Sequence, residues 1–251
     1  MQQVPLVSTI IPTYNRASLV PEAIDSVLAQ TYRHIEIIVI DDGSTDGTTQ
    51  MIARHAGAGD IIAGHHAERN FGKGTAIRTA IALASGDVLL MQDGDLEYDP
   101  NDYARILDPI ITGEADVVYG SRFLGKPVGM AARNRVANWI LTTAANLLYG
   151  ARLTDEATAY KAFRASVLRE VHLTCRRFEF CPEITAKLRR LEYHIHEVPI
   201  SYNARGIAEG KKIRSRDGFQ ALWTLVKYRF ASRRMFVRAG AATLVAEANP
   251  H

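Results

Sequence analysis

The stretch from Ile35 to Ala56, IEIIVIDDGSTDGTTQMIARHA, decides the fold class because it joins a strand to a helix through an acidic turn. Residues 35–40 are a short apolar run rich in β-branched side chains, which predicts a buried strand. The run stops at Asp41-Asp42-Gly43-Ser44, and helical spacing resumes over residues 46–56. A strand followed closely by a helix is the unit from which parallel sheets with covering helices are built.

The same alternation extends on both sides of this unit. Buried strands are predicted at 7–11, 61–62, 88–91 and 116–120, and helices at 18–30, 74–84 and 103–111. In the second half we predict helices at 134–149, 182–191 and 218–234 and a strand at 195–202. We therefore expect an α/β fold with a mostly parallel sheet flanked by helices. A single domain is expected over residues 1–235, followed by a flexible C-terminal tail at 236–251.

The composition is that of a chain that can bury a sizeable core, with 251 residues, 47% hydrophobic and 23% charged. No segment resembles a signal peptide, and the longest helix-like apolar run, Val136 to Leu148, is about half the length that a bilayer requires. We therefore expect a cytoplasmic protein. The two cysteines, Cys175 and Cys181, are expected to be reduced thiols rather than a disulfide.

Positive charge is concentrated near the C-terminus. Residues 205–238 contain ten basic residues and two acids, a balance of +8, whereas the whole chain carries +3. Within this segment, residues 218–234 combine helical spacing of apolar side chains with a basic remainder. Such an amphipathic helix can lie on anionic lipid or pack on its own domain. We favour the packed arrangement, with the basic face turned to lipid headgroups at the cytoplasmic face of a membrane.

Two acidic clusters directly follow predicted strands. Asp41 and Asp42 follow the second strand, and Asp93 and Asp95 follow the fourth. Ligands of open α/β sheets bind outside the carboxyl ends of the strands, and acids gathered there repel one another unless a cation or a hydrogen-bonding ligand compensates them. Helix capping accounts poorly for the second pair. Two carboxylates one residue apart on a loop suit Mg²⁺ or Mn²⁺ shared with a diphosphate.

Several other catalytic patterns are incomplete or missing. Asn70 to Thr75, NFGKGT, looks like the end of a P-loop but lacks the first glycine and the Ser/Thr position of that motif. No G-x-G-x-x-G follows the first strand, and no G-x-S-x-G is found. The histidines lack partners at zinc-ligand spacing. These observations disfavour dinucleotide enzymes, serine hydrolases and zinc enzymes.

The motifs taken together resemble the inverting family 2 glycosyltransferases, which have a GT-A fold. The motifs that match this family are Pro12-Thr13-Tyr14-Asn15, residues 41–48, residues 70–74 and residues 92–100. The second half is similar to the narrower polyprenyl-phosphate branch, the dolichyl-phosphate mannose or glucose synthase type. The motifs that carry this similarity are residues 119–123, 153–155, 160–164, 178–183 and 209–213.

The resemblance implies that residues 1–125 bind the nucleotide sugar and that residues 126–235 bind the acceptor. The implied donor-binding residues are Pro12, Tyr14, Asn15, Asp42, Lys73, Asp93 and Asp95, although Lys73 could equally be a surface lysine. The implied metal ligands are Asp93 and Asp95. The implied acceptor-phosphate ligands are Arg122, Arg205, Lys211 and Lys212. The implied catalytic residues are Asp95, Asp155 and Arg205, with Asp155 either orienting the acceptor site or acting as a base.

The predicted reaction is the inverting, metal-dependent transfer of a hexose from GDP-mannose or UDP-glucose to a polyprenyl or dolichyl phosphate. A lipid phosphate is already a dianion at neutral pH and needs no strong general base. One alternative is transfer to a hydroxyl of a glycan, glycolipid or small molecule, and another is a non-catalytic nucleotide-sugar-binding module. We expect peripheral membrane contact through the basic C-terminal helix. Nucleic-acid binding is not expected, because the basic segment lacks interleaved exposed aromatic residues.

Overall fold

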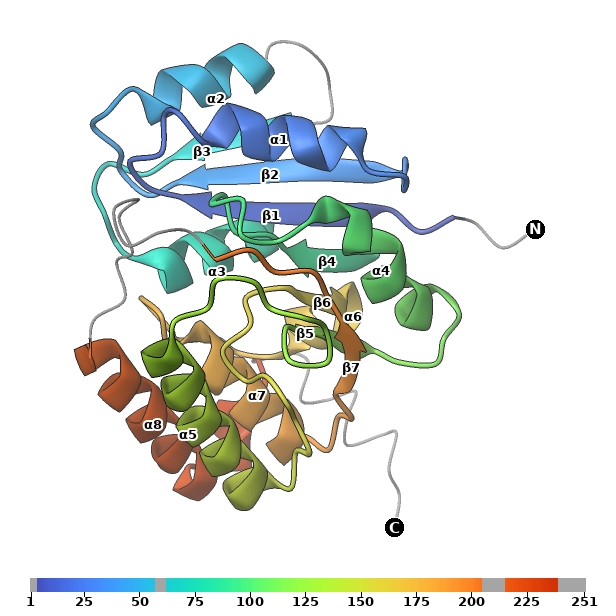
Figure 1. The fold of residues 1–251 in the computed structure, drawn as a ribbon, viewed down its shortest axis with the longest axis vertical. Helices are drawn as coiled ribbons and strands as arrows, with labels where there is room; N and C mark the ends of the chain where they lie inside the picture. Colours follow the sequence, from blue (N-terminus) through green and yellow to red (C-terminus); the bar gives the residue numbers. More distant parts are fainter. Residues whose placement is uncertain (1–3, 57–61, 205–214, 239–251) are drawn as a thin grey trace.

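The computed structural model describes residues 4–56, 62–204 and 215–238. Within these residues, seven strands form one sheet in the order β3-β2-β1-β4-β6-β5-β7, with helices on both faces (Figure 1). The strands are β1 (Val7–Thr13), β2 (Ile35–Asp41), β3 (Ile62–His66), β4 (Val88–Met91), β5 (Val117–Ser121), β6 (Lys161–Arg164) and β7 (His196–Pro199). The predicted α/β class, with a mostly parallel sheet flanked by helices, is confirmed.

Eight α-helices connect or cover these strands in the described part of the chain. They are α1 (Val20–Ala29), α2 (Thr48–Ala56), α3 (Lys73–Leu83), α4 (Tyr103–Ile111), α5 (Ala132–Tyr149), α6 (Ala165–Glu170), α7 (Phe180–Arg190) and α8 (Ser215–Phe230). Two short 3-10 helices, η1 (Pro100–Asp102) and η3 (Arg233–Met235), complete the set. Among the described helices, none has the length and apolar character needed to cross a membrane.

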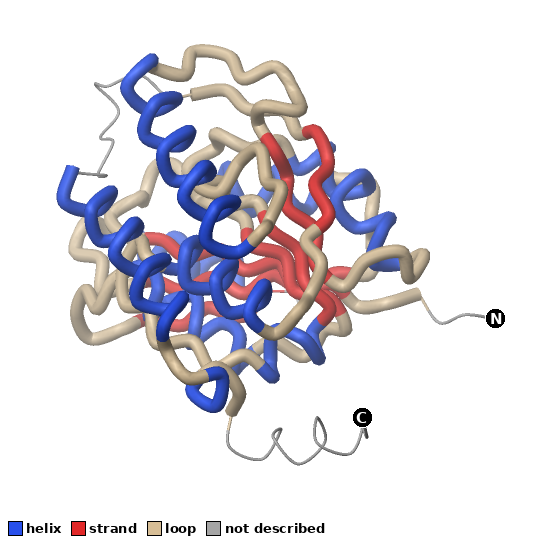
Figure 2. Tube along the Cα trace, turned by 90° about the horizontal axis from the view of Figure 1, so that it is seen from below, coloured by secondary structure: helices blue, strands red, loops and turns tan. Residues whose placement is uncertain are grey.

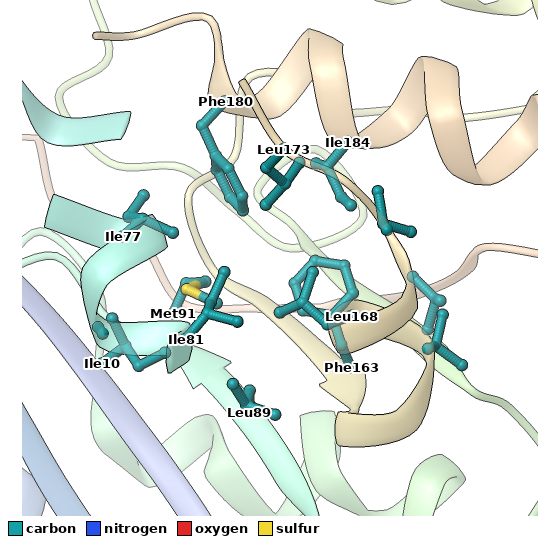
Figure 3. Packing of buried hydrophobic residues seen from close by; sticks show 14 of the residues in the cluster. Ile10, Ile77, Ile81, Leu89, Met91, Phe163, Leu168, Leu173, Phe180 and Ile184 are labelled. Atoms are coloured by element: carbon teal, nitrogen blue, oxygen red, sulfur yellow. The ribbon is translucent and has the colours of Figure 1, made fainter. Parts of the chain in front are cut away.

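The core has two layers because the central strands are buried on both faces. Ile10 and Ile11 are neighbours on β1 and therefore point to opposite faces of the sheet. Ile10 packs in the cluster that includes Ile77 of α3 and Ile184 of α7 (Figure 3). Ile11 packs in the second cluster, together with Ile24 of α1. This double burial explains why these strands are continuous apolar runs rather than alternating ones.

One strand departs from the parallel arrangement. β6 pairs antiparallel with both β4 and β5, so that Ala162 lies opposite Leu90 on one side and Val118 on the other. The remaining pairs in the described sheet are parallel. The sequence analysis assigned no element to residues 161–170, which form β6 and α6. The strand is only four residues long. Its first residue is a lysine, Lys161, which is fully buried although a charged residue predicts an exposed position.

The helices α5, α7 and α8 form a layer of their own beyond the sheet. Figures 1 and 2 show α5 and α8 side by side, and Leu141 and Leu225 belong to the small core between them. Phe236, which the sequence analysis placed in the flexible tail, is fully buried in this core. Val237 forms a bridge with Val171. The folded chain therefore continues beyond residue 235, and residues 239–251 of the predicted tail lie outside the described residues.

Candidate active site

Three segments that are distant in the sequence meet where β1, β2 and β4 end. These strands are parallel neighbours, with Thr13 at the end of β1 opposite Asp41 at the end of β2. β4 lies on the other side of β1 and ends at Met91, opposite Ile10. The predicted donor-binding residues Pro12, Tyr14 and Asn15, Asp42, and Asp93 with Asp95 all lie at or just beyond these three ends. The topology therefore gathers them at one edge of the sheet, where α/β proteins bind their ligands.

Asn15 joins the loops that follow β1 and β2. Its backbone NH donates to Oγ of Ser44 at 2.8 Å, and its side-chain oxygen accepts from the backbone NH of Thr45 at 2.9 Å. Its φ of 50° is a left-handed conformation that asparagine tolerates better than most residues. Asn15 thus fixes the shape of the acidic turn beside Asp42.

Asp42 connects the end of β2 to the loop before α3. Its two carboxylate oxygens accept hydrogen bonds from the backbone NH groups of Phe71 at 2.8 Å and Gly72 at 2.7 Å. Burial raises the pKa of Asp42 above its ordinary value, although both NH groups favour the charged form. The neighbouring Asp41 points elsewhere and binds the imidazole of His66 at 3.0 Å. The side chain of Asp42 thus holds residues 71 and 72, directly before α3, whereas Asp41 contacts the start of the same loop through its backbone carbonyl oxygen, which accepts from the NH of Ala67 at 2.8 Å.

Lys73 and Asp93 form an ion pair beside the end of β4. The distance from Nζ of Lys73 to Oδ1 of Asp93 is 2.5 Å, and both side chains are mostly buried. Burial acts to lower the pKa of Lys73, but the Asp93 carboxylate raises it above its ordinary value. Lys73 is the first residue of α3, so the loop that Asp42 holds also places this ammonium group. The predicted diphosphate-binding lysine therefore lies in contact with a predicted metal ligand.

Asp93 and Asp95 flank Gly94 in the turn after β4. A Cβ atom at Gly94 would lie 3.1 Å from Cγ2 of Ile11, so the turn packs closely on β1. The described residues contain no group of three or more His, Cys, Asp or Glu side chains placed to hold a metal ion. Mg²⁺ and Mn²⁺ suit oxygen ligands, and Mg²⁺ is commonly bound through one or two carboxylates plus substrate phosphates. The pair therefore fits a cation that is shared with a diphosphate, and it does not fit a metal held by protein side chains alone.

Arg122 and Asp155 form a bidentate ion pair in the interior. Nε of Arg122 donates to Oδ2 of Asp155 at 2.6 Å, and Nη2 donates to Oδ1 at 2.7 Å. The backbone NH of Arg122 adds a third bond to Oδ2 at 3.0 Å. Asp155 is fully buried and Arg122 is 9% exposed. Both carboxylate oxygens of Asp155 are thus engaged by Arg122, which favours an orienting role for this aspartate over that of a base.

Glu197, on β7, holds the segment that carries Asp155. It accepts hydrogen bonds from the backbone NH and the hydroxyl of Thr154, at 2.7 and 2.9 Å, and from the backbone NH of Asp155 at 3.1 Å. The sequence analysis did not single out this residue. Its partners lie more than 40 residues earlier in the chain, and no pattern within the predicted strand at 195–202 distinguishes it.

Tyr202 connects the acceptor half to the turn that carries Asp95. The guanidinium of Arg122 lies 5.1 Å from the centre of the Tyr202 ring, within the range of a cation–π contact. The hydroxyl of Tyr202 donates to Oε2 of Glu97 at 2.7 Å. Glu97 comes two residues after Asp95, and its backbone NH donates to Oδ1 of Asp95 at 3.2 Å. Glu97 lies within the motif at residues 92–100 but has no predicted role there, and no sequence pattern marks Tyr202 as a site residue.

The structure thus brings Lys73 to Asp93 and Arg122 to Asp155. Three further predicted residues, Arg205, Lys211 and Lys212, lie outside the described residues. Cys175 and Cys181 are both free, as predicted.

Residues 8–172 match the family described as glycosyl transferase family 2. The chain belongs to this family. Over 201 residues it is 31% identical to Glycosyltransferase AglJ of Haloferax volcanii, in an alignment that covers 79% of this chain and 63% of that protein. The chain therefore spans less than two thirds of that relative's length.

A second relative matches over most of both chains. This family 2 glycosyltransferase is 31% identical over 213 residues to the undecaprenyl-phosphate mannosyltransferase of Micrococcus luteus, with 82% of this chain and 86% of the relative covered. Its fold is similar to that of glucosyl-3-phosphoglycerate synthase of Mycobacterium tuberculosis, solved with Mn²⁺, UDP and phosphoglyceric acid. The TM-score is 0.69 at 20% identity, over 91% of this chain and 80% of that one. The predicted enzyme class, the GT-A fold and the polyprenyl-phosphate branch of the family are confirmed.

Proposed function

We propose that this family 2 glycosyltransferase transfers a hexose from a nucleotide sugar to a polyprenyl phosphate, with inversion and with Mg²⁺ or Mn²⁺. The proposal rests on one arrangement of side chains. The carboxylates of Asp93 and Asp95 lie at the strand ends, and Tyr202 and Glu97 link their turn to the oriented guanidinium of Arg122. Asp93 and Asp95 would hold the metal ion and the donor diphosphate, and the nearby guanidinium of Arg122 is suited to bind the acceptor phosphate.

The donor is held by residues of the first half. Pro12, Tyr14 and Asn15 shape one side of the nucleoside site, and Asp42 fixes the opposing loop through its bonds to residues 71 and 72. Lys73 contacts the diphosphate and balances the charge of Asp93. With a divalent cation bound at Asp93 and Asp95, the negative charge that develops on the departing nucleoside diphosphate is neutralised.

The acceptor phosphate is positioned rather than activated. Its oxygen attacks the anomeric carbon of the sugar while the bond from that carbon to the diphosphate oxygen breaks, and the bonding electron pair leaves with the nucleoside diphosphate. Because the attacking group is already an anion, catalysis rests on alignment and charge stabilisation. Arg122 supplies this alignment, Asp155 orients Arg122, and Arg205, Lys211 and Lys212 add positive charge from the segment that the structure does not describe.

A lipid acceptor requires a membrane surface, and α5 and α8 carry apolar side chains that suit one. The most exposed of these, between 65% and 82% exposed, are Trp139 and Leu147 on α5 and Phe219, Trp223 and Phe230 on α8. α8 packs on the protein through its other side, which includes Leu225. The basic segment therefore does carry exposed aromatic residues, contrary to the expectation from the sequence, and beside basic residues they favour the interface of an anionic bilayer. We therefore assign peripheral membrane contact to the apolar faces of both helices as well as to their basic residues.

The test is transfer from a panel of labelled nucleotide sugars, including GDP-mannose and UDP-glucose, to a short polyprenyl phosphate in Mg²⁺, Mn²⁺ or EDTA. Parallel reactions contain 3-phosphoglycerate or sugar hydroxyls as acceptors. Asp95→Ala is the site variant, and Asp108→Ala, on the exposed side of α4, is its matched control. We expect metal-dependent formation of a lipid-phosphate sugar that Asp95→Ala abolishes and Asp108→Ala leaves unchanged. Transfer only to another acceptor would refute the lipid acceptor, and absence of binding by every nucleotide sugar of the panel would refute the proposed donors.

A further inference from the structure

A cavity of about 560 Å³ lies beside the donor site and is separated from it by the loop before α3. The residues that line this cavity are Arg69, Asn70, Phe71, Thr75, Arg78 and Arg176. The loop before α3 contacts both the donor site and the cavity. The backbone NH groups of Phe71 and Gly72 bind Asp42, whereas the side chain of Phe71 lines the cavity. The cavity is therefore adjacent to the proposed donor site and has its own set of side chains.

The lining carries three positive charges. Among the residues that the structure describes, no carboxylate lies within 4.0 Å of the guanidinium groups of Arg69, Arg78 or Arg176. Arg69 stacks on the ring of Phe71 at 4.9 Å, and Arg78 makes a long 3.5 Å hydrogen bond to the carbonyl oxygen of Cys175. Arg69 and Arg176 are exposed and Arg78 is half-buried, so the three charges create a positive potential at the mouth of the cavity that attracts an anion.

The backbone that carries these arginines is tightly packed. The backbone NH of Thr75 donates to the carbonyl oxygen of Arg176 at 3.1 Å, which ties the start of α3 to the segment before α7. Gly72 has a φ of 99°, and a Cβ atom there would lie 2.3 Å from the same carbonyl oxygen. Gly74 also lies close to this segment, with a Cβ position 2.9 Å from the carbonyl carbon of Cys175. Arg78, on α3, and Arg176 therefore extend from backbone that is already in place, which lowers the entropic cost of binding.

We propose that this cavity is a second anion site, distinct from the donor and acceptor sites, that binds the phosphate dianion of a phosphorylated compound. Arginine binds phosphate oxygens through pairs of parallel N–H groups, and three arginines match a phosphate monoester or diphosphate better than a singly charged carboxylate. The phosphate belongs either to a soluble metabolite or to a membrane lipid headgroup. The inference rests on the cavity and its charges and does not depend on the proposed transfer reaction.

The first experiment measures binding of inorganic pyrophosphate to the full chain by calorimetry, at low salt and in EDTA. Arg78→Gln combined with Arg176→Gln removes two of the charges without adding bulk. The matched control is Arg54→Gln, an exposed arginine on α2 whose described contact is to the sulfur of Met51. We expect at least about tenfold weaker binding for the double variant, from the loss of charge-assisted hydrogen bonds, and less than about twofold change for the control. Urea midpoints equal to that of the unaltered protein show that all variants are folded.

The second experiment distinguishes the two sources of phosphate. Flotation with phosphatidylcholine vesicles, with and without phosphatidic acid, is compared for the same proteins. A loss confined to pyrophosphate binding assigns the site to soluble phosphates, and a loss that includes phosphatidic-acid vesicles assigns it to lipid. Unchanged binding of both probes by the double variant overturns the proposal. Loss of all UDP and GDP binding in the double variant also overturns it, because the cavity would then be part of the donor site.

Discussion

The two arginine–aspartate pairs Arg122–Asp155, which is bidentate, and Arg164–Asp116, which has one side-chain hydrogen bond, differ also in their exposure to water. Their shortest N–O distances are 2.6 and 2.7 Å, yet Asp155 is fully buried whereas Asp116 is 50% exposed. An Asp155→Asn variant leaves the Arg122 charge without its partner in the interior. We expect it to lower the free energy of unfolding by about 3 kcal/mol, whereas Asp116→Asn costs under about 1 kcal/mol. Urea denaturation measures both, and equal losses would contradict the structural role of the buried pair.

Glu156 is a buried acid whose two carboxylate oxygens have no hydrogen-bond partner among the described residues. Burial raises its pKa from an ordinary 4.5 to about 8, against the opposing charge of Lys161. Between these two pH values the folded protein keeps a proton that the unfolded chain releases, so Glu156 lowers stability as the pH rises through this window. Below it, the residue is neutral in both states.

A Glu156→Gln variant removes this titration. We expect its free energy of unfolding to exceed that of the unaltered protein by an amount that grows from pH 5 to pH 8, reaching on the order of 4 kcal/mol, since one pKa unit corresponds to about 1.4 kcal/mol. Urea denaturation at several pH values measures the difference. Glu114→Gln, at an exposed position, is the control and should show no such trend. A pH-independent difference for Glu156→Gln would mean that the carboxyl is not neutral in the folded protein.

The sequence singled out individual candidate residues but not their contact partners. Asp42, Asp93 and Asp95 became candidates because they lie within four residues of strand ends, and the ends of parallel strands are common ligand-binding positions. The pairing of Lys73 with Asp93 spans 20 residues, and that of Arg122 with Asp155 spans 33. Such contacts depend on which strands become neighbours. No spacing rule relates Tyr202 to Arg122, so this contact became visible only in the folded structure.

Among the secondary-structure elements, the parallel strands were predictable and the antiparallel one was not. β1, β2 and β4 are buried on both faces and appear in the sequence as apolar runs. β6 lies between β4 and β5 and reverses the sheet direction, yet it has four residues and begins with a buried lysine. The amine of Lys161 donates to the carbonyl oxygen of Glu156 at 3.2 Å, which allows the lysine to be buried there. That compensation cannot be read from local sequence.

The start of α3 is the element on which both the donor site and the arginine-lined cavity depend. Gly72 and Gly113 both have positive φ, 99° and 81°, but a Cβ atom would clash only at Gly72. Gly113→Ala therefore destabilises the protein only through its left-handed backbone conformation, by about 1–2 kcal/mol. Gly72→Ala has the same backbone cost, and its Cβ atom also pushes the loop away from Arg176. This movement displaces Lys73 and the NH groups that bind Asp42.

We expect Gly72→Ala to raise the KM for the nucleotide sugar several-fold, and Gly113→Ala to leave it within about twofold, under conditions where urea denaturation shows both proteins to be folded. Steady-state kinetics at saturating acceptor provides the comparison. If the two alanine variants shift KM equally, the position of the loop does not limit donor binding.

In the molecule as a whole, the candidate site residues lie at the strand ends, whereas α5 and α8 carry exposed aromatic side chains. α5 and α8 pack against each other through residues such as Leu141 and Leu225, while Trp139 and Trp223 are 67% and 65% exposed. Exposed arginine and lysine residues occur on the same two helices, at 133 and 135 on α5 and at 227 and 229 on α8. Exposing large aromatic residues to water contributes nothing to folding, so this surface is best explained by a partner that covers it.

If that partner is an anionic bilayer, replacing both Trp139 and Trp223 by serine should weaken sedimentation with phosphatidylglycerol vesicles at least about tenfold, since each tryptophan loses its burial in the interface. Stability should change little, because both side chains are exposed in the folded protein. Leu83→Ser, at the exposed end of α3, is the matched control. Transfer to a polyprenyl phosphate embedded in vesicles should fall with binding, while transfer to a short, soluble acceptor should not. Equal loss with both acceptors would instead place the tryptophans in the catalytic structure, and unchanged sedimentation would remove α5 and α8 from the membrane contact.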